Sequence, residues 1–575
     1  MAITRPRRDI AHLMRETKQN NRYDDRGFVP PSELRKIITD DLTRGVSRSF
    51  RQPACNVVKV TATLLSILTN SDKTVKACLC RMLDSGLDDS YLPVTYDPET
   101  TQIASGEGRR RRIFITGLEE YQRSRFVENQ WHFHLPEFGD IDETGVREQR
   151  WLDPSTILPV VYCAPDAHAG AYGQVYQIRM HHEYLKIRPA PTEKNNPMLA
   201  LKRLTVLDAE KAYRQEEAAL LRINRLNHKH LVKLIDSFKR GRDYFFLFPW
   251  AAGGDLFGLW RKYDIGSDHE NRSDEMKRWL LIQTRGIVSA IEAIHNLPDT
   301  AHGSEENGRH GDIRPHNILL FYDSESGHPS SCSEDRYPWS EGAGGTLRVA
   351  DVGLARFHEK VTDNRQGPTD TTGAFLEYAP PSTSQARYDG TKPPRSRSYD
   401  IWTLGCLFHD LIVWVLFGAA EVERLHYARR SDGSLSSQFY WWNISSQSYT
   451  MNPVVEESIE KIRLALHRFG GNSDKWLEEL VDIVEKDLLQ INEAKRITSL
   501  DLDNKLLDML ARAGCDIDAA YLCSSTADNG GEDDTAAILT MRNLNSSSSN
   551  VKTKKKNKHP RGGVSNWFRR HQSGS

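Results

Sequence analysis

The chain has 575 residues, a length that exceeds what one hydrophobic core supports and predicts roughly two or three folded units. Its formal net charge of -1 excludes a global electrostatic field that would draw the whole chain to nucleic acid or to a membrane surface. The eight cysteines contain no CxxC pair and no Cys/His cluster with zinc spacing, so we expect free thiols in a reducing intracellular compartment, cytoplasmic or nuclear.

The first part of the chain carries no recognisable catalytic motif. Residues 1–30 are polar and basic and are expected to be poorly ordered. From Pro31 onward apolar residues recur at helical spacing, and further apolar stretches cover residues 57–68 and 75–83. Residues 31–150 are therefore predicted to form a helical N-terminal module.

Strand patterns dominate residues 154–250, and helical patterns dominate residues 255–512. This order predicts an α+β domain with a small strand-rich lobe and a large helical lobe. The apolar run over residues 401–418 is interrupted by His409 and Asp410, so it is expected to be a buried helix and not a membrane span.

Two segments of the strand-rich part suit phosphate binding. Gly170 and Gly173, followed by Val175, fit a turn between strands where backbone N–H groups approach phosphates, although a purely structural hairpin has the same pattern. Lys202 lies inside an apolar strand and either faces solvent or pairs with a glutamate of the next helix. Glu217 is the chosen partner, with the adjacent Glu216 as the alternative; such a pair would aim the ammonium group at phosphates.

The segment from His310 to Leu320 is the most informative part of the sequence. Asp312 can accept a hydroxyl proton, Arg314 can neutralise a phosphate, and Asn317 can reach a metal ion just before an apolar strand. A later strand ends at Asp351, where an Asp-Val-Gly turn puts a carboxylate in position to hold Mg²⁺.

Taken in this order, the motifs resemble the eukaryotic protein kinase signature. The His-Gly-Asp loop and the Asp-Val-Gly turn are similar to those of a fungal kinase-like group. The resemblance covers residues 154–512 and implies a two-lobed protein kinase fold that binds ATP and Mg²⁺ and phosphorylates Ser or Thr of a protein substrate. It also implies that Asp400, at the start of the buried helix, anchors the catalytic loop.

The resemblance assigns roles position by position. Asp312 would be the catalytic base, assisted by Lys202 and Arg314, while Asn317 and Asp351 would be the metal ligands. The remaining nucleotide contacts, together with Lys202, would be Gly170, Gly173, Val175, Ala200, Glu217, Pro249, Ala251 and Leu319.

Several positions depart from the kinase pattern. His168 replaces the first loop glycine, Gly311 replaces the catalytic-loop arginine, and Val352 replaces the phenylalanine of the metal-binding turn. Ser382 replaces a glutamate, so Arg496 lacks its usual partner and is expected either to be solvated or to pair with Glu377. These losses leave open the alternative of a pseudokinase, a nucleotide-binding scaffold without transfer activity.

Residues 524–575 combine an acidic stretch, a serine run and a basic end, a composition that predicts a disordered tail. The basic end fits either a nuclear import signal or a plain solvated tail. A nucleic-acid partner is not favoured by the sequence, although this tail leaves it open.

Overall fold

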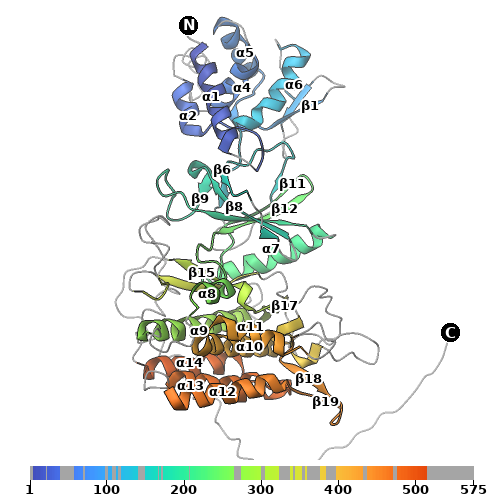
Figure 1. The fold of residues 1–575 in the computed structure, drawn as a ribbon. Helices are drawn as coiled ribbons and strands as arrows, with labels where there is room; N and C mark the ends of the chain where they lie inside the picture. Colours follow the sequence, from blue (N-terminus) through green and yellow to red (C-terminus); the bar gives the residue numbers. More distant parts are fainter. Residues whose placement is uncertain are drawn as a thin grey trace, which may run out of the picture. The chain divides into compact units, whose positions relative to one another are not determined.

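In the computed structural model, the N-terminal module, the strand-rich lobe and the helical lobe are all described in part (Figure 1). The described residues are 4–20, 23–38, 57–68, 72–97, 102–105, 112–113, 118–139, 149–165, 168–169, 173–205, 208–264, 273–298, 305–322, 337–340, 344–351, 356–358, 376–383, 396–430, 437–469 and 475–513.

The N-terminal module is not purely helical, because a small antiparallel sheet with strand order β1-β2-β3 accompanies its helices. The expectation that residues 1–30 are poorly ordered is also wrong for the part of this segment that the structure describes, residues 4–20 and 23–30. Helix α1 occupies most of this segment, and Ile10 is buried in the hydrophobic core of the module together with Val60, Leu64 and Phe126. The elements of the module are α1 (Thr4–Asn20), α2 (Pro31–Ile37), α4 (Val58–Ile67), α5 (Asp72–Asp84), α6 (Glu120–Asn129), β1 (Val94–Asp97), β2 (Gln102–Ser105) and β3 (Arg112–Ile113).

The connection from the module runs into the sheets of the strand-rich lobe. Strand β4 (Phe138–Gly139) pairs in parallel with β9 (Leu185–Lys186), and β5 (Trp151–Leu152) pairs in parallel with β11 (Asp236–Arg240). The backbone of this connection is thus hydrogen-bonded to strands of the lobe.

The main sheet of this lobe has strand order β5-β11-β12-β10-β8-β6, with β7 beside β8. Side chains alternate between its faces, as the two-residue period of a strand requires. Phe245 packs into a core with Phe238, whereas its neighbour Phe246 packs on Tyr213 of helix α7. The remaining bounds are β6 (Val160–Cys163), β7 (His168–Ala169), β8 (Gly173–Met180), β10 (Leu199–Leu204), β12 (Asp243–Pro249) and α7 (Ala209–Arg225).

The second lobe is mainly helical, so the predicted α+β architecture with strands before helices is confirmed. Local caps mark several helix starts; Ser273, for example, accepts a hydrogen bond from the backbone N–H of Met276 at the start of α9. The helices are α8 (Leu256–Lys262), α9 (Asp274–His295), α10 (Arg397–Phe417), α11 (Ala419–Ala428), α12 (Pro453–Phe469), α13 (Lys475–Ile483) and α14 (Ser499–Arg512). The strands are β13 (Leu297–Pro298), β14 (Glu305–Arg309), β15 (Ile318–Tyr322), β16 (Gly345–Val349), β17 (Arg356–His358), β18 (Tyr440–Asn443) and β19 (Ser448–Met451).

Helix α10 is the predicted buried helix. Its length and hydropathy would suffice to cross a membrane, but its side chains from Tyr399 to Leu416 are buried inside the lobe. Gly405 allows a close approach there, because a Cβ atom at this position would lie 2.9 Å from the side chain of Leu488. The helix therefore serves as the core of the lobe.

Candidate active site

A cavity of about 750 Å³ lies where strands of the first lobe meet residues of the second. This volume falls within the range of small-molecule sites in proteins. Its wall combines apolar side chains with a few charged and amide groups. The lining residues that the sequence analysis had selected are Gly173, Val175, Ala200, Lys202, Pro249, Ala251, Arg314, Asn317, Leu319 and Asp351.

Lys202, which lines this cavity, is held between two carboxylates. Its Nζ atom lies 2.8 Å from Oε1 of Glu216 and 3.1 Å from Oδ1 of Asp351. Burial alone would lower the pKa of Lys202, but the two carboxylates outweigh it and hold the pKa above its ordinary value. The lysine is therefore a fixed positive charge that faces the cavity and does not point to solvent.

The choice of Glu217 as the partner of Lys202 was wrong, and the alternative, Glu216, holds. Consecutive helix residues point about 100° apart, so only one of two adjacent glutamates can face a given strand. The Glu217 carboxylate instead accepts hydrogen bonds from the hydroxyl groups of Tyr213 and Ser237, each at 2.7 Å.

Asp312, Arg314 and Asn317 form a compact hydrogen-bonded group. The amide nitrogen of Asn317 donates to both the backbone carbonyl and the carboxylate of Asp312, at 2.8 Å in each case. Nε of Arg314 lies 3.3 Å from the same carboxylate. Burial raises the pKa of Asp312 above its ordinary value, although Arg314 acts in the opposite direction. One buried carboxylate thus lies beside a cation and an amide.

A hairpin brings the second acidic residue to the same place. Strands β15 and β16 pair with Ile318 opposite Val349, so Asn317 and Asp351 flank the same end of the hairpin. The backbone N–H of Ala350 donates to the carbonyl of Asn317 at 2.8 Å, which fixes the separation of the two segments. Asp351 has a φ of 59°, a left-handed backbone conformation that is uncommon outside glycine.

Asp400 holds the backbone of the two residues that precede Asp312 in the sequence. Its carboxylate accepts hydrogen bonds from the backbone N–H groups of His310 at 2.7 Å and Gly311 at 2.8 Å, and lies 2.9 Å from Nε2 of His295. Burial alone would raise the pKa of Asp400, but these partners outweigh it and the pKa lies below its ordinary value. Gly311 has a φ of 84°, which explains why a glycine suits this loop.

The segment after strand β12 is hydrogen-bonded to strand β15 of the hairpin through its backbone. Gly253 donates to the carbonyl of Leu320 at 3.0 Å, and Leu320 donates to the carbonyl of Gly254 at 2.8 Å. Beside this clamp, Asp255 lies 2.8 Å from Nδ1 of His316, and both residues line the cavity. No motif in the sequence pointed to this pair, although Asp255 stands at the N-cap position before α8.

The glycine loop is described only in part. Gly170 lies outside the described residues, whereas Gly173 is the first residue of strand β8. Val352, in the separate turn after Asp351, also lies outside the described residues. A Cβ atom at Gly173 would overlap the backbone oxygen of Arg203, so the glycine is required by close packing of two strands. At this position the hairpin interpretation explains the residue, while its backbone still lines the cavity.

Both expectations for Arg496 were wrong. Arg496 is 8% exposed and donates to the backbone carbonyls of Gln490 at 2.9 Å and Ser398 at 3.0 Å. Glu377 pairs instead with the buried Arg429, with Nη2 and Oε1 3.2 Å apart, and Arg429 also lies 3.3 Å from Asp410. Arg429, and not Arg496, therefore pairs with the carboxylate of Glu377, the residue before Tyr378.

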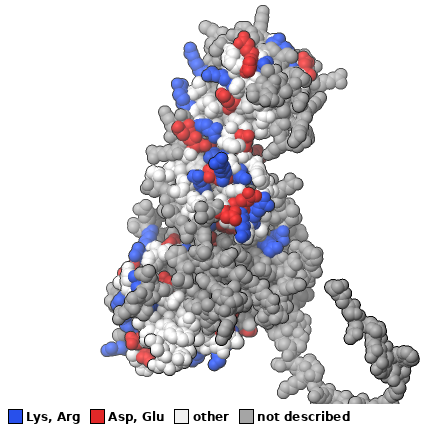
Figure 2. All heavy atoms as spheres, turned by 90° about the vertical axis from the view of Figure 1, so that its right-hand side faces the viewer, with Lys and Arg blue, Asp and Glu red and all other residues white. Residues whose placement is uncertain are grey.

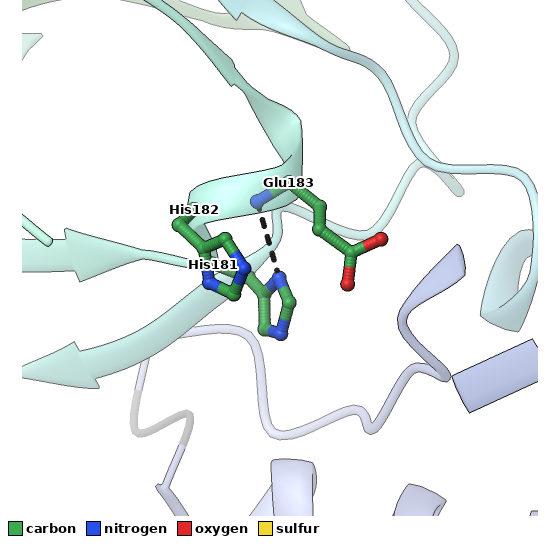
Figure 3. Close-up of side chains that lie close together, drawn as sticks. All are labelled: His181, His182 and Glu183. Carbon is green, nitrogen blue, oxygen red and sulfur yellow. Dashed lines mark hydrogen bonds between the residues drawn. The ribbon is translucent and has the colours of Figure 1, made fainter. Parts of the chain in front are cut away.

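Figure 3 shows a second group of ligand-type side chains, His181, His182 and Glu183, whose ligand atoms lie within 4.8 Å of one another. The Glu183 carboxylate points away from the His182 ring (Figure 3) and accepts hydrogen bonds from the backbone N–H of Ser32 at 2.9 Å and its hydroxyl at 2.5 Å. Nδ1 of His181 accepts a bond from the N–H of Glu183 at 3.4 Å, and its ring packs edge-on against Phe28. These contacts assign the group to the docking of helix α2 on this turn.

Lys/Arg and Asp/Glu side chains are interspersed on the face of the described surface drawn in Figure 2. This mixture agrees with the formal net charge of -1. The basic end of the predicted tail lies outside the described residues, so the interpretations of residues 524–575 stay predictions.

Comparison with known proteins agrees with this geometry. The family model described as the protein kinase domain matches residues 169–506. Cyclin-dependent kinase 12 of Drosophila melanogaster is 25% identical over 58% of the chain and 24% of its own length. The probable serine/threonine-protein kinase fhkD of Dictyostelium discoideum is 24% identical over 35% of the chain and 22% of its own length. Serine/threonine-protein kinase srk1 of Schizosaccharomyces pombe is 26% identical over 39% of the chain and 36% of its own length. The chain thus spans about a quarter of the length of the first two relatives.

Proposed function

Because the chain belongs to the protein kinase family, we propose that it transfers the γ-phosphate of ATP to Ser or Thr hydroxyl groups of protein substrates. One observation carries the proposal: Lys202, Asn317 and Asp351 line a single cavity, and Asn317 is hydrogen-bonded to Asp312. A cation, an amide and two carboxylates at one place are the groups that phosphoryl transfer requires.

The cavity suits ATP in both its apolar and its polar parts. Val175, Ala200 and Leu319 supply apolar surface for the adenine ring, next to the backbone of residues 249–251. Lys202 would hold the phosphates, since its ammonium group is fixed by Glu216 at 2.8 Å. The apolar end and the charged end of the cavity thus match the two ends of the nucleotide.

Asp351 and Asn317 would hold a divalent metal ion, which we propose to be Mg²⁺. Carboxylate and amide oxygens together with phosphate oxygens are the ligands that this ion prefers. When bound, the ion neutralises the charge that develops on the phosphate oxygens.

Asp312 would act as the general base of the transfer. The substrate hydroxyl oxygen forms a bond to the γ-phosphorus, the bond from that phosphorus to the ADP oxygen breaks, and the hydroxyl proton passes to Asp312. Asn317 orients the carboxylate through its bond of 2.8 Å, and Arg314, 3.3 Å away, supplies positive charge beside the transferred group.

Selectivity for Ser and Thr rests on the relatives, since fhkD and srk1 are both called serine/threonine-protein kinases. We also propose an intracellular location, which the free thiols of Cys78, Cys80, Cys163 and Cys406 support.

The test is transfer of labelled phosphate from Mg²⁺-ATP to a generic basic protein, with ATP binding measured in parallel. We expect incorporation by the wild-type chain and its loss in Asp312→Asn, with ATP binding retained. Wild-type protein that binds ATP and transfers nothing would establish the alternative, a nucleotide-binding scaffold.

A further inference from the structure

Helix α7 carries two adjacent glutamates, but only one can face Lys202. Glu216 is 5% exposed and pairs with Lys202, whereas the side chain of Glu217 is directed to strand β11. A rotation of α7 by about 100° about its axis would exchange the two carboxylates. Some contact outside the Lys202 pair must therefore select the rotation in which Glu216 faces the cavity.

Two hydroxyl groups hold the Glu217 carboxylate. The Tyr213 hydroxyl lies one turn earlier on the same helix, and its ring is fully buried and stacks on Phe246 of β12 at a centroid distance of 5.1 Å. The Ser237 hydroxyl belongs to β11, so its bond of 2.7 Å joins the helix to the sheet. Glu217 is thus fixed to the sheet through Ser237 directly and through the Tyr213 ring.

Ser237 is itself fixed by its neighbour Asp236, which is fully buried. Oδ1 of Asp236 accepts a hydrogen bond from the backbone N–H of Ser237 at 2.7 Å. Oδ2 accepts bonds from the backbone N–H of Gly139 at 3.0 Å and from Nη1 of Arg150 at 2.8 Å. Gly139 and Arg150 belong to the connection between the N-terminal module and the strand-rich lobe, so a continuous series of hydrogen bonds runs from that connection to α7.

We propose that Ser237 and Glu217 are positioning residues which, tied through Asp236 to Arg150 of the connection, set the rotation of α7 so that Glu216 faces Lys202. The consequence for catalysis rests on the phosphoryl transfer proposed above; the consequence for α7 does not. The N-terminal extension thereby supports the active site from outside the cavity. Neither Ser237 nor Glu217 lines the cavity, so each acts only through the Lys202–Glu216 pair.

The first test is amide hydrogen exchange of residues 209–225 in the full chain. Ser237→Ala removes the hydroxyl that joins helix and sheet, and we expect exchange in α7 to rise about tenfold, as for the loss of a hydrogen bond to a charged group. Ser237→Thr keeps a hydroxyl and should restore the wild-type rate. Arg214→Gln, on the exposed face of α7, is the matched control and should leave exchange unchanged. Wild-type exchange in Ser237→Ala would overturn the proposal.

The second test asks whether Arg150 and Ser237 act on α7 as one unit. Arg150→Gln should raise α7 exchange, and the double variant with Ser237→Ala should exchange no faster than the faster single variant. If Arg150→Gln does not fold, Arg150→Lys takes its place; it keeps a charge beside Asp236 but loses the planar guanidinium group, so it should raise α7 exchange by a smaller amount. Additive effects of the two substitutions would contradict the coupling.

Kinetics separate this proposal from the proposed function. In an active chain, Ser237→Ala should lower kcat about tenfold, Ser237→Thr should recover it, and KM for the protein substrate should stay near wild type. A wild-type chain without transfer activity would refute the kinase proposal, while the exchange experiments would still decide the role of Ser237. Normal kcat in Ser237→Ala together with raised α7 exchange would overturn the catalytic part of the inference alone.

Discussion

The backbone nitrogen of Gly311 lies 2.8 Å from the carboxylate of Asp400, so the first turn of the buried helix α10 fixes the peptide next to Asp312. The core of the helical lobe and the loop that carries Asp312 are thus joined by a charge-assisted hydrogen bond. Any motion of the loop relative to this core must break that bond inside a buried environment.

Asp400→Asn tests this anchor. The amide keeps one acceptor oxygen but turns an N–H group toward a buried N–H donor, so the free energy of unfolding should fall by about 2–3 kcal/mol. Urea denaturation measures the change. Asp482→Asn, in an exposed ion pair with Arg463, is the control and should cost less than about 1 kcal/mol. Equal effects of the two substitutions would show that Asp400 is no anchor.

Glu216→Gln and Glu217→Gln test which glutamate pairs with Lys202. Loss of the Glu216 charge removes one of the two anions that hold the ammonium group, so phosphate transfer should fall at least roughly tenfold. Glu217→Gln keeps an acceptor oxygen for Ser237, so its rate of phosphate transfer should fall by less than that of Glu216→Gln. Initial rates at saturating ATP give the comparison, and a larger loss in Glu217→Gln would reverse the assignment.

Arg429→Met and Arg496→Met should lower the free energy of unfolding by different amounts. Removing Arg429 leaves the buried Asp410 without its cation, a change that costs about 3–5 kcal/mol. Arg496 donates to two backbone carbonyls, and burial lowers its pKa to about 10, so its charge is less well compensated. Arg496→Met should therefore cost about 1–2 kcal/mol. Chemical denaturation of both variants decides, and a larger loss for Arg496→Met would contradict the assignment.

The folded chain should lose stability as the pH drops below about 6.5, and His230 is one cause. Burial lowers the pKa of His230 from 6.5 to about 3, and Nδ1 lies 2.7 Å from the Leu347 carbonyl, to which the neutral ring donates. Between these two pKa values the unfolded chain binds a proton that the folded chain does not, so stability is full above pH 6.5 and declines as the pH drops toward 3. The melting temperature of His230→Gln should decline less over pH 6.5 to 4 than that of wild type; parallel curves would exclude this group as a cause.

The sequence predicted that these polar groups lie together, because Asp312, Arg314 and Asn317 belong to one short segment. A single hairpin brings Asp351 beside that segment. The partner of Lys202 was harder to predict, since the choice between Glu216 and Glu217 depends on the rotation of α7 about its axis. That rotation is fixed by Ser237, which lies 20 residues further along the chain.

Other features depended on contacts that no local pattern contains. Arg429 reaches Glu377 across 52 residues, so it could not be recognised as the buried cation of that segment. Strands β1 and β2 cover four residues each and β3 covers two, which is too short for a clear periodic signal, so the sequence favours helices throughout the module. Helix α1 was missed because its sequence is strongly polar, and its few apolar residues, such as Ile10, are buried only through tertiary packing.

The most direct test of the central claim is the dependence of phosphate transfer on Asp351 and Mg²⁺ in the full chain. We predict that wild-type protein transfers phosphate only with the metal, and that Asp351→Asn loses transfer by a factor of about 100 or more while it remains folded. Wild-type rates in Asp351→Asn, or transfer that is indifferent to the metal, would contradict the account.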